Sequence, residues 1–269
     1  MNDDIIKRLR TALIVLPVLF LIVYGTISFF VLALMASFIC LYEFYGIALK
    51  DVSIKHEVCI TGFIMMTIWL LLLFGGFTQY LWMVAVVNFM IMAVIAVFRF
   101  HQSPDILHII AYQAFGVIYI SGLISFLLLI HQFEKGHFWI YLTFMMIFAC
   151  DTGAYFAGKQ FGIHALCKAV SPKKTIEGYL GGWLSCVITC LALATLFRLR
   201  ISIEHMLGLS TVVGLFAPLG DLFESAFKRV ADIKDSGNLL PGHGGLLDRV
   251  DALLFSTPLI YGYKVYFIG

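Results

Sequence analysis

The sequence predicts an all-α, polytopic membrane protein of about nine transmembrane helices with a polar cavity that faces the cytoplasm. Hydrophobic residues make up 61% of the 269 residues, and charged residues only 13%. Soluble domains carry about a quarter charged residues, so this composition excludes an ordinary soluble protein. Apolar runs of roughly 20 residues recur along the chain, which is the length that a helix needs to cross a bilayer.

The apolar runs give the order of the expected spans. The first run, Thr11 to Leu49, would be nearly twice as long as the hydrocarbon core is thick, so we expect two helices with a break near Gly25. It has no small-residue cleavage site, so we expect it to be retained in the membrane. About five spans then fall in residues 1–135 and the rest in residues 136–269. The other expected spans are residues 57–75, 80–98, 106–130, 138–156, 178–197, 205–219 and 253–268.

The basic residues indicate how the chain is oriented. With the N-terminus in the cytoplasm, 14 of the 18 Lys and Arg residues fall on the cytoplasmic side. Only Lys135, Arg198, Arg200 and Lys264 are left for the other face. This asymmetry is the one that orients membrane proteins with their positive loops inside.

Cysteine and tryptophan residues are assigned to packing. The six cysteines lie mostly in apolar runs without metal-ligand or disulfide spacing, which is typical of small buried hydrophobic residues. Trp69, Trp82 and Trp139 are expected to face lipid or the membrane interface.

Charged residues gather in one segment of 31 residues, from Asp221 to Asp251. It holds six of the chain's 16 acidic residues together with four basic ones. Carboxylates at the margin of a membrane usually face a polar cavity or one another, so the segment indicates a site. Its acidic residues are Asp221, Glu224, Asp232, Asp235, Asp248 and Asp251, and its basic residues are Lys228, Arg229, Lys234 and Arg249.

The two ends of this segment have the spacing of helix faces. Four residues at its start stand at i, i+3, i+4 and i+7, and two at its end stand at i and i+3. Two carboxylate-bearing helix ends joined by a glycine-rich loop favour a cage for a hard divalent cation. The alternative is that these are loop charges, solvated or paired with neighbouring bases. The residues are Asp221, Glu224, Ser225 and Lys228 at the start, and Asp248 and Asp251 at the end.

A glycine run lies between the two helix ends. Gly242, Gly244 and Gly245 permit positive φ and a close approach of backbone N–H groups to an anion, as phosphate-binding loops require. Any tight turn has the same composition. His243 could position a phosphate or carry a proton, although a histidine in a loop is more often neither.

A second polar cluster runs from Asp151 to Gly178. An unpaired acid at the cytoplasmic end of a span, such as Asp151, is a functional candidate. Residues 171–175 form a basic, hydroxyl-bearing turn suited to phosphate oxygens, and we favour this role for Lys173 and Lys174. For Lys159 and Lys168 we favour contact with anionic lipid.

Taken together, these residues resemble the signature of the phosphatidate cytidylyltransferases, also called CDP-diacylglycerol synthases. The motifs cover roughly the C-terminal 120 residues, and residues 151–158, 171–178 and 220–225 are part of the likeness. Ile163, Ile176 and the pair Val230–Ala231 depart from the usual pattern. The signature residues are Ser225, Lys228, Arg229, Lys234, Asp235, Gly237, Leu240, Pro241, His243, Gly244, Gly245, Asp248, Arg249 and Asp251.

The resemblance implies a nucleotidyltransferase that converts CTP and phosphatidate to CDP-diacylglycerol and pyrophosphate in phospholipid synthesis. Such a reaction needs positioning and charge neutralisation of phosphates, which Mg²⁺ and basic side chains supply. A second, monovalent cation is left open. The resemblance also implies a multi-pass protein of the cell inner (cytoplasmic) membrane that contacts membrane lipids and no nucleic acid, with its active site facing the cytoplasm. A homodimer is left open.

The resemblance further assigns roles to the residues, with residues 136–269 as the catalytic region. The expected metal ligands are Asp221 and Asp248, with Glu224 and Asp251 in support. The expected catalytic residues are Asp221, Lys228, Arg229, Asp248, Arg249 and Asp251. The expected substrate-binding residues are Asp151, Ser171, Lys173, Lys174, Glu177, Ser225, Lys234, Asp235, His243, Gly244 and Gly245.

Three alternatives stay open on the residues alone. A polyprenol kinase, or a cytidylyltransferase for an archaeal-type lipid phosphate, fits the same generic features. An ion-coupled transporter would use buried carboxylates as cation sites, but no internal repeat is evident. A separate question concerns Glu43, which lies inside the second expected span. It is either a packing contact or a site residue, and the sequence does not decide between these two roles.

Overall fold

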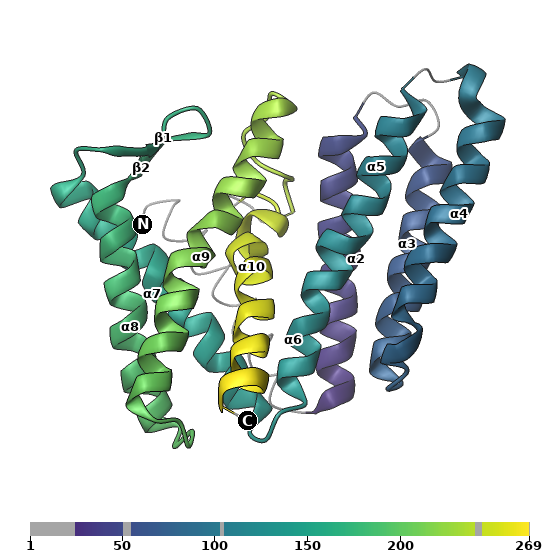
Figure 1. Cartoon of the computed structure of the whole chain (residues 1–269). Coiled ribbons are helices and arrows are strands. Elements are labelled where there is room, and N and C mark those ends of the chain that lie inside the picture. Colours follow the sequence, from purple (N-terminus) through teal and green to yellow (C-terminus); the bar gives the residue numbers. More distant parts are fainter. Residues whose placement is uncertain (1–24, 51–54, 103–104, 240–243, 269) are drawn as a thin grey trace, which may run out of the picture. The chain divides into compact units, whose positions relative to one another are not determined.

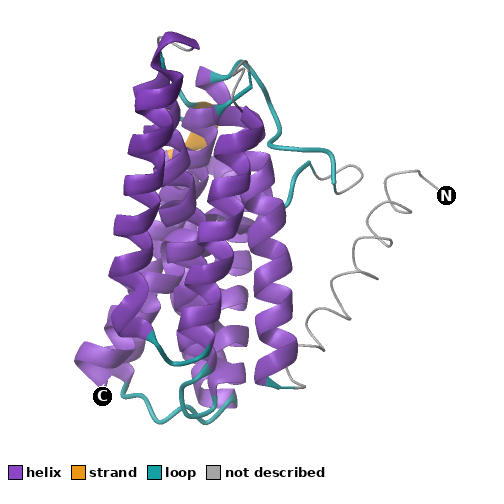
Figure 2. Cartoon of the chain, turned by 90° about the vertical axis from the view of Figure 1, so that its right-hand side faces the viewer, coloured by secondary structure: helices purple, strands orange, loops and turns teal. Residues whose placement is uncertain are grey.

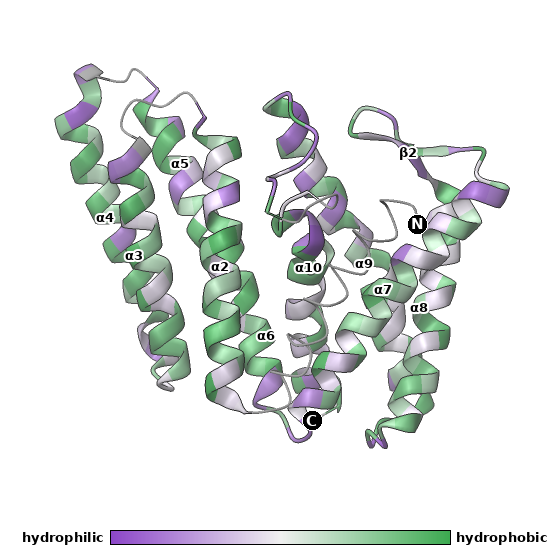
Figure 3. Ribbon diagram, turned by 180° about the vertical axis from the view of Figure 1, so that it is seen from behind, coloured by the Kyte–Doolittle hydropathy of each residue, from purple (hydrophilic) through white to green (hydrophobic). Residues whose placement is uncertain are grey.

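The computed structural model describes residues 25–50, 55–102, 105–239 and 244–268, and most of them are helical (Figures 1 and 2). Seven helical stretches among these residues are long and apolar enough to cross a membrane, which agrees with a multi-pass membrane protein. Hydrophobic residues run along the helices in Figure 3, and hydrophilic residues mark the start of α10. The helices are α2 (Thr26–Ala48), α3 (Lys55–Phe74), α4 (Leu81–Arg99), α5 (Ile106–Val117), α6 (Leu123–His131), α7 (Gly136–Phe161), α8 (Ile176–Leu196), α9 (Ile203–Val230) and α10 (Leu247–Tyr263).

The expected spans agree with these helices to within a few residues, with two exceptions. α9 continues past residue 219 to Val230, and α10 begins at Leu247 rather than at residue 253. In both cases the helix includes acidic residues that an apolar window leaves out. The first expected helix lies outside the described residues, so a total of nine spans stays a prediction. Gly25 precedes α2 with φ 132°, a conformation that favours glycine and fits a break there.

The described chain divides into two compact units. One comprises the described residues within Met1–Leu128 and Asp235–Leu247, and the other comprises those within Leu129–Lys234 and Asp248–Gly269. We call them unit 1 and unit 2. Each is described by itself below.

Unit 1 has an aromatic core on α2. The ring of Phe44 packs against Phe115 and Tyr119, and the hydroxyl of Tyr45 donates a hydrogen bond to the Gln113 carbonyl at 3.1 Å. Gly116 leaves room for the rings of Phe44 and Tyr45, since a Cβ at position 116 would lie 2.8 Å from each ring. α5 and α6 are joined by a π-helical turn, Ile118–Gly122, so that residues 106–131 form one continuous stretch.

Unit 2 is built on a close approach of α7 and α8. A Cβ on Gly153 would lie 2.0 Å from Ser185 Oγ, and one on Gly181 would lie 2.2 Å from Ala157 Cβ. Small residues at such crossings let membrane helices pack backbone to backbone. Gly153 and Gly181 therefore set the α7–α8 distance.

The buried cysteines of unit 2 act as small packing residues, as expected. Cys150, Cys186 and Cys190 each direct Sγ at a backbone carbonyl of α9, at 3.5 to 4.0 Å. All six cysteines have free thiols. Cys150 reaches the carbonyl of Gly214, which lacks its usual helical donor because residue 218 is proline.

Trp139 is buried and does not face lipid, so the lipid-facing part of that prediction is wrong for this residue. Its side chain is only 3% exposed and contacts the ring of Phe133, with the Lys264 ammonium 6.0 Å from the indole. A lysine over an aromatic face is attracted to it, which favours an inward position for this ring. Trp82, at 80% exposure, agrees with the expectation, whereas Trp69 is partly buried and donates a hydrogen bond to Ser125 Oγ.

The chain between α7 and α8 forms a hairpin that the sequence did not predict. Strand β1 (Ala165–Cys167) pairs antiparallel with β2 (Ser171–Thr175), with Ala165 opposite Thr175 and Cys167 opposite Ser171. Residues 171–175 are therefore a strand and not the expected turn. Thr175 also caps α8, because its Oγ1 accepts a hydrogen bond from the Gly178 N–H at 3.1 Å.

Candidate active site

The C-terminal half of α9 carries the centre of the candidate site, and the residues of this centre lie in unit 2. Lys228 donates to Glu224 Oε2 at 2.8 Å, one helical turn away, and to Asp248 Oδ1 on α10 at 2.5 Å. Glu224 is 1% exposed and Lys228 is 9% exposed. A buried ammonium held between two carboxylates joins α9 to α10 and balances part of their negative charge.

One oxygen of Glu224 is left over in this arrangement. Its Oε1 is buried and has no hydrogen-bond partner in the described part of the chain. A buried carboxylate oxygen without a donor is costly, and a cation or water can relieve that cost. One carboxylate oxygen of Glu224 is therefore available to bind a cation or a water molecule.

Close helix packing places Asp251 beside α9. Gly220 makes this possible, because a Cβ at that position would lie 2.3 Å from the Asp251 carbonyl oxygen. The rings of Phe223 and Phe255 extend the contact. The Asp251 side chain is only 6% exposed and lies within electrostatic range of Asp221. This corner of the site has an excess of acidic groups, which a cation would stabilise.

The hairpin brings basic groups to the same site. Lys174 on β2 forms an ion pair with Asp221 Oδ2 at 2.5 Å, and Arg229 Nε donates to the Val170 carbonyl at 3.2 Å. Asp151 on α7 lies within electrostatic range of Asp221, Lys174 and Arg249. Three segments that are far apart in sequence therefore meet around Asp221.

Two further predicted residues have local partners. Ser225 Oγ donates to Asp221 Oδ1 at 3.2 Å, as the shared helix face predicted. Glu177 accepts hydrogen bonds from the backbone N–H groups of Ile163 and His164, and its Oε1 lies 2.6 Å from His164 Nδ1. Glu177 thus ties the start of the hairpin to α8, and its substrate-binding role stays a prediction.

The remaining predicted residues lie at the surface or in the loop that leads to α10. Lys173, Lys234, Asp235 and Arg249 are exposed, and Ser171 is half-buried. Gly244 has φ 80°, the conformation that the glycine run predicted. Gly245 is needed for space instead, since a Cβ there would lie 2.1 Å from Ser236 Oγ. His243 lies outside the described residues.

The donor set fits a hard divalent cation in chemistry, though the described side chains are not gathered around one point. Asp221, Glu224, Asp248 and Asp251 offer only oxygen, which Mg²⁺ prefers. The free Glu224 Oε1 agrees with such a role. Among the described residues, however, no group of three His, Cys, Asp or Glu side chains forms a ready metal site. Lysine ammonium groups stand against Asp221, Glu224 and Asp248 instead.

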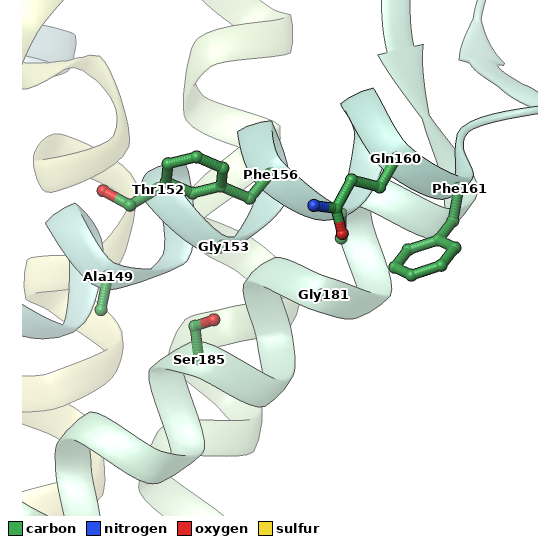
Figure 4. Close-up of a pocket in the computed structure, with 9 residues that line it drawn as sticks. Ala149, Thr152, Gly153, Phe156, Gln160, Phe161, Gly181 and Ser185 are labelled. Carbon is green, nitrogen blue, oxygen red and sulfur yellow. The ribbon is translucent and has the colours of Figure 1, made fainter.

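A separate groove lies where α7 and α8 cross (Figure 4). It measures about 430 Å³, and its mostly apolar walls include Phe156 and Phe161, with Thr152, Gln160 and Ser185 as polar groups. The described residues that line it include none of the predicted site residues. We therefore assign the chemistry to the charged cluster of α9, α10 and the hairpin, and not to this groove.

The sequence did not decide whether Glu43 is a packing contact or a site residue, and the structure shows which groups it binds. It lies near the end of α2 in unit 1, 5% exposed, and its carboxylate accepts hydrogen bonds from Ser236, Leu246 and Leu247. The partners are about 200 positions away in sequence. In the sequence, Glu43 is recognisable only as a single acidic residue within an apolar run. That pattern does not indicate which residues its carboxylate contacts.

The fold and this cluster define a polytopic helical membrane protein with a charged site on a helix pair. Comparison with known proteins gives the family. A sequence profile of the cytidylyltransferase family matches residues 6–267, and the chain belongs to that family.

Individual relatives give a more specific comparison than the family profile does. Proteins named phosphatidate cytidylyltransferase from Staphylococcus aureus (strain COL), Bacillus subtilis (strain 168) and Staphylococcus saprophyticus are 40%, 39% and 37% identical over 150, 157 and 163 residues. The matches cover 56%, 56% and 61% of this chain, and 57%, 57% and 59% of the relatives. The matched part is thus less than two thirds of each relative's length.

Proposed function

We propose that the chain is a phosphatidate cytidylyltransferase that converts CTP and phosphatidate to CDP-diacylglycerol and pyrophosphate. The observation that carries the proposal is the charged cluster of unit 2, in which Lys174 pairs with Asp221 and Lys228 pairs with Glu224 and Asp248. Membership of the cytidylyltransferase family and the names of the relatives support it.

In the proposed reaction a phosphate oxygen of phosphatidate attacks the α-phosphorus of CTP. The new P–O bond forms as the bond to the bridging oxygen of the β-phosphate breaks, and pyrophosphate leaves with the electron pair. The lipid phosphate is already an oxyanion, so no side chain has to act as a nucleophile. The protein must therefore position two anionic substrates and neutralise their charge.

We assign that task to the basic residues of the cluster. Lys174, with Lys173 and Ser171 on the same strand, would contact phosphate oxygens, and Lys174 would exchange its partner Asp221 for them. Lys228 would stay between Glu224 and Asp248 and hold α9 and α10 together. Arg229 would keep the hairpin against α9 through its bond to Val170. Lys234 and Arg249 are exposed and would meet the incoming phosphates.

We also propose that the enzyme uses Mg²⁺. Asp221 and Asp248 would hold it, with Glu224 and Asp251 in support, and the buried Glu224 oxygen without a hydrogen-bond partner in the described part of the chain favours this. When bound, Mg²⁺ would offset the charge that develops on the leaving pyrophosphate.

We further propose that the site faces the cytoplasm from the inner membrane, because the positive-inside pattern places the ends of α7 and α9 there. CTP is available on that side, and phosphatidate would arrive from the surrounding bilayer. Membrane lipids would thus surround the protein and also supply its lipid substrate, phosphatidate.

Pyrophosphate release from the purified protein tests the proposal. Release should require CTP, phosphatidate and Mg²⁺ together, with one CDP-diacylglycerol formed per pyrophosphate. Release without phosphatidate, or none with all three present, would refute it. Omission of Mg²⁺ alone tests the metal: full activity in its absence would remove the metal from the proposal and leave the transfer reaction in place.

A further inference from the structure

The carboxylate of Glu43 binds both the middle of the loop between α9 and α10 and the start of α10. Within unit 1, its Oε2 accepts hydrogen bonds from Ser236 Oγ at 3.2 Å and from the Leu247 N–H at 2.7 Å, while its Oε1 accepts one from the Leu246 N–H at 3.0 Å. Both oxygens are therefore engaged by donors on two sides of the loop. A carboxylate used in this way serves as an acceptor for the chain rather than as a cation ligand.

Two glycines are fitted to this carboxylate. A Cβ on Gly237 would lie 2.6 Å from Glu43 Oε1, and a Cβ on Gly245 would lie 2.6 Å from both oxygens. Contacts this short are not tolerated, so any larger residue would displace the carboxylate or the backbone. Gly237 and Gly245 thus have a shared reason to be glycine, namely the space that Glu43 occupies.

The position of the bonds links Glu43 to the catalytic segment. Leu246 and Leu247 stand at the start of α10, where backbone N–H groups have no partner inside the helix. A carboxylate there satisfies two of these groups and is favoured by the helix dipole. Asp248, the next residue of α10 after Leu247, is a proposed metal ligand. The orientation of its side chain depends on where the helix begins.

We propose that Glu43 is a positioning residue for cytidylyl transfer, which fixes the start of α10 and thereby the orientation of Asp248. This rests on the proposed function. Glu43 does not touch substrate, and it acts through the backbone of residues 246 and 247. A displaced Asp248 would weaken stabilisation that is needed mainly in the transition state, so kcat should fall more than KM changes.

A matched control is needed because any buried polar residue can stabilise a fold. Asn88 and Gln113, also in unit 1, exchange two amide hydrogen bonds at 3.1 and 2.9 Å and are buried. Asn88→Leu leaves the Gln113 side chain without these two bonds and should lower the thermal midpoint, while the three hydrogen bonds that Glu43 accepts keep all their donors. Glu43→Gln keeps the shape of Glu43 but turns one acceptor into a donor that faces other donors.

The test compares kinetics and amide exchange in the full-length protein at a temperature where both variants are folded. We expect Glu43→Gln to lower kcat about tenfold or more with KM for CTP changed less than about threefold. Amide hydrogen exchange at Leu246 and Leu247 should become faster. Asn88→Leu should lower the midpoint at least as much and keep the wild-type kcat and the wild-type exchange at these two amides.

A second pair of variants covers the case in which Glu43→Gln does not fold. Ser236→Ala removes one of the three hydrogen-bond donors to the Glu43 carboxylate and should lower kcat by about threefold. In the double variant with Glu43→Asp, the loss of kcat should be smaller than the two separate losses combined, because both changes affect the same contact. Wild-type kcat in Glu43→Gln or, if that variant is unfolded, in Glu43→Asp and Ser236→Ala would overturn the proposal. So would unchanged exchange at Leu246 and Leu247, or an equal loss of kcat in Asn88→Leu. If the wild-type protein makes no CDP-diacylglycerol, the proposed function fails and the exchange comparison alone decides whether Glu43 fixes α10.

Discussion

The two units bury polar groups in different ways. Unit 1 pairs neutral groups, such as the amides of Asn88 and Gln113 or the hydroxyls of Ser37 and Ser121 with carbonyls of their own helix. Unit 2 has such hydroxyl–carbonyl bonds as well, at Ser210 and Ser256. It also gathers ionised groups, with Lys228 between Glu224 and Asp248 and Lys174 on Asp221. Among the buried residues that the structure describes in unit 1, Glu43 is the acidic exception, and its carboxylate binds the loop that leads into α10.

This difference indicates where the chemistry lies. Neutral hydrogen-bonded pairs satisfy buried groups at little cost and specify packing. Buried ion pairs carry a desolvation penalty that often cancels their attraction, so stability is a weak reason to keep several together. The charged cluster of unit 2 is better explained as a site for anionic substrates and a cation.

The largest effect should follow the loss of Lys228. Lys228→Met leaves Glu224 and Asp248 buried without their cation, which should reduce the free energy of unfolding by about 3–5 kcal/mol and abolish activity. Thermal unfolding in detergent measures it. Lys234→Met, at an exposed lysine, should change stability by no more than about 0.5 kcal/mol. An equal effect of both variants would show that the buried cluster has no special role.

Asp248 should matter most for catalysis itself. Asp248→Asn removes the charge but keeps the shape, and we expect kcat to fall by about 10²–10³-fold. The control is Asp232→Asn in the loop between α9 and α10. Asp232 is exposed and has φ 52°, which asparagine adopts as readily. Steady-state rates of CDP-diacylglycerol formation measure both, and a normal rate for Asp248→Asn would contradict its assignment to the metal.

The glycine beside Glu43 tests the exception in unit 1. Gly245→Ala forces a Cβ against Ser236 and the Glu43 carboxylate and should cost about 1–3 kcal/mol of stability. Gly46→Ala on α2 meets nothing within 4 Å and should be neutral or stabilising. Thermal midpoints that fall equally in both variants would show that the space around Glu43 is not restricted.

Lys174 should have the smallest of these effects. Lys174→Gln removes the ion pair with Asp221 and a proposed phosphate contact, and kcat/KM for CTP should fall about tenfold. Lys168→Gln in the same hairpin connection should leave kcat/KM unchanged, because we assign that lysine to anionic lipid. If the two variants behave alike, the hairpin acts only through its general charge.

Local pattern predicted much of this structure. Apolar runs placed most helices to within a few residues, and helical spacing put Asp221 and Ser225 on one face, where they are hydrogen-bonded. What failed depends on distant partners. The strand at residues 171–175 forms because it pairs with β1, Trp139 turns inward beside Lys264, and Glu43 meets residues about 200 positions away. Spacing within one helix carries no information about such contacts.

The position of a label in CTP tests the central claim most directly. The purified protein is given phosphatidate, Mg²⁺ and CTP labelled in either the α- or the γ-phosphate. We predict that α-label enters the lipid product and that γ-label is released as pyrophosphate. Label from the γ-phosphate in the lipid would identify a kinase, and no label in lipid from either position would contradict nucleotidyl transfer by this site.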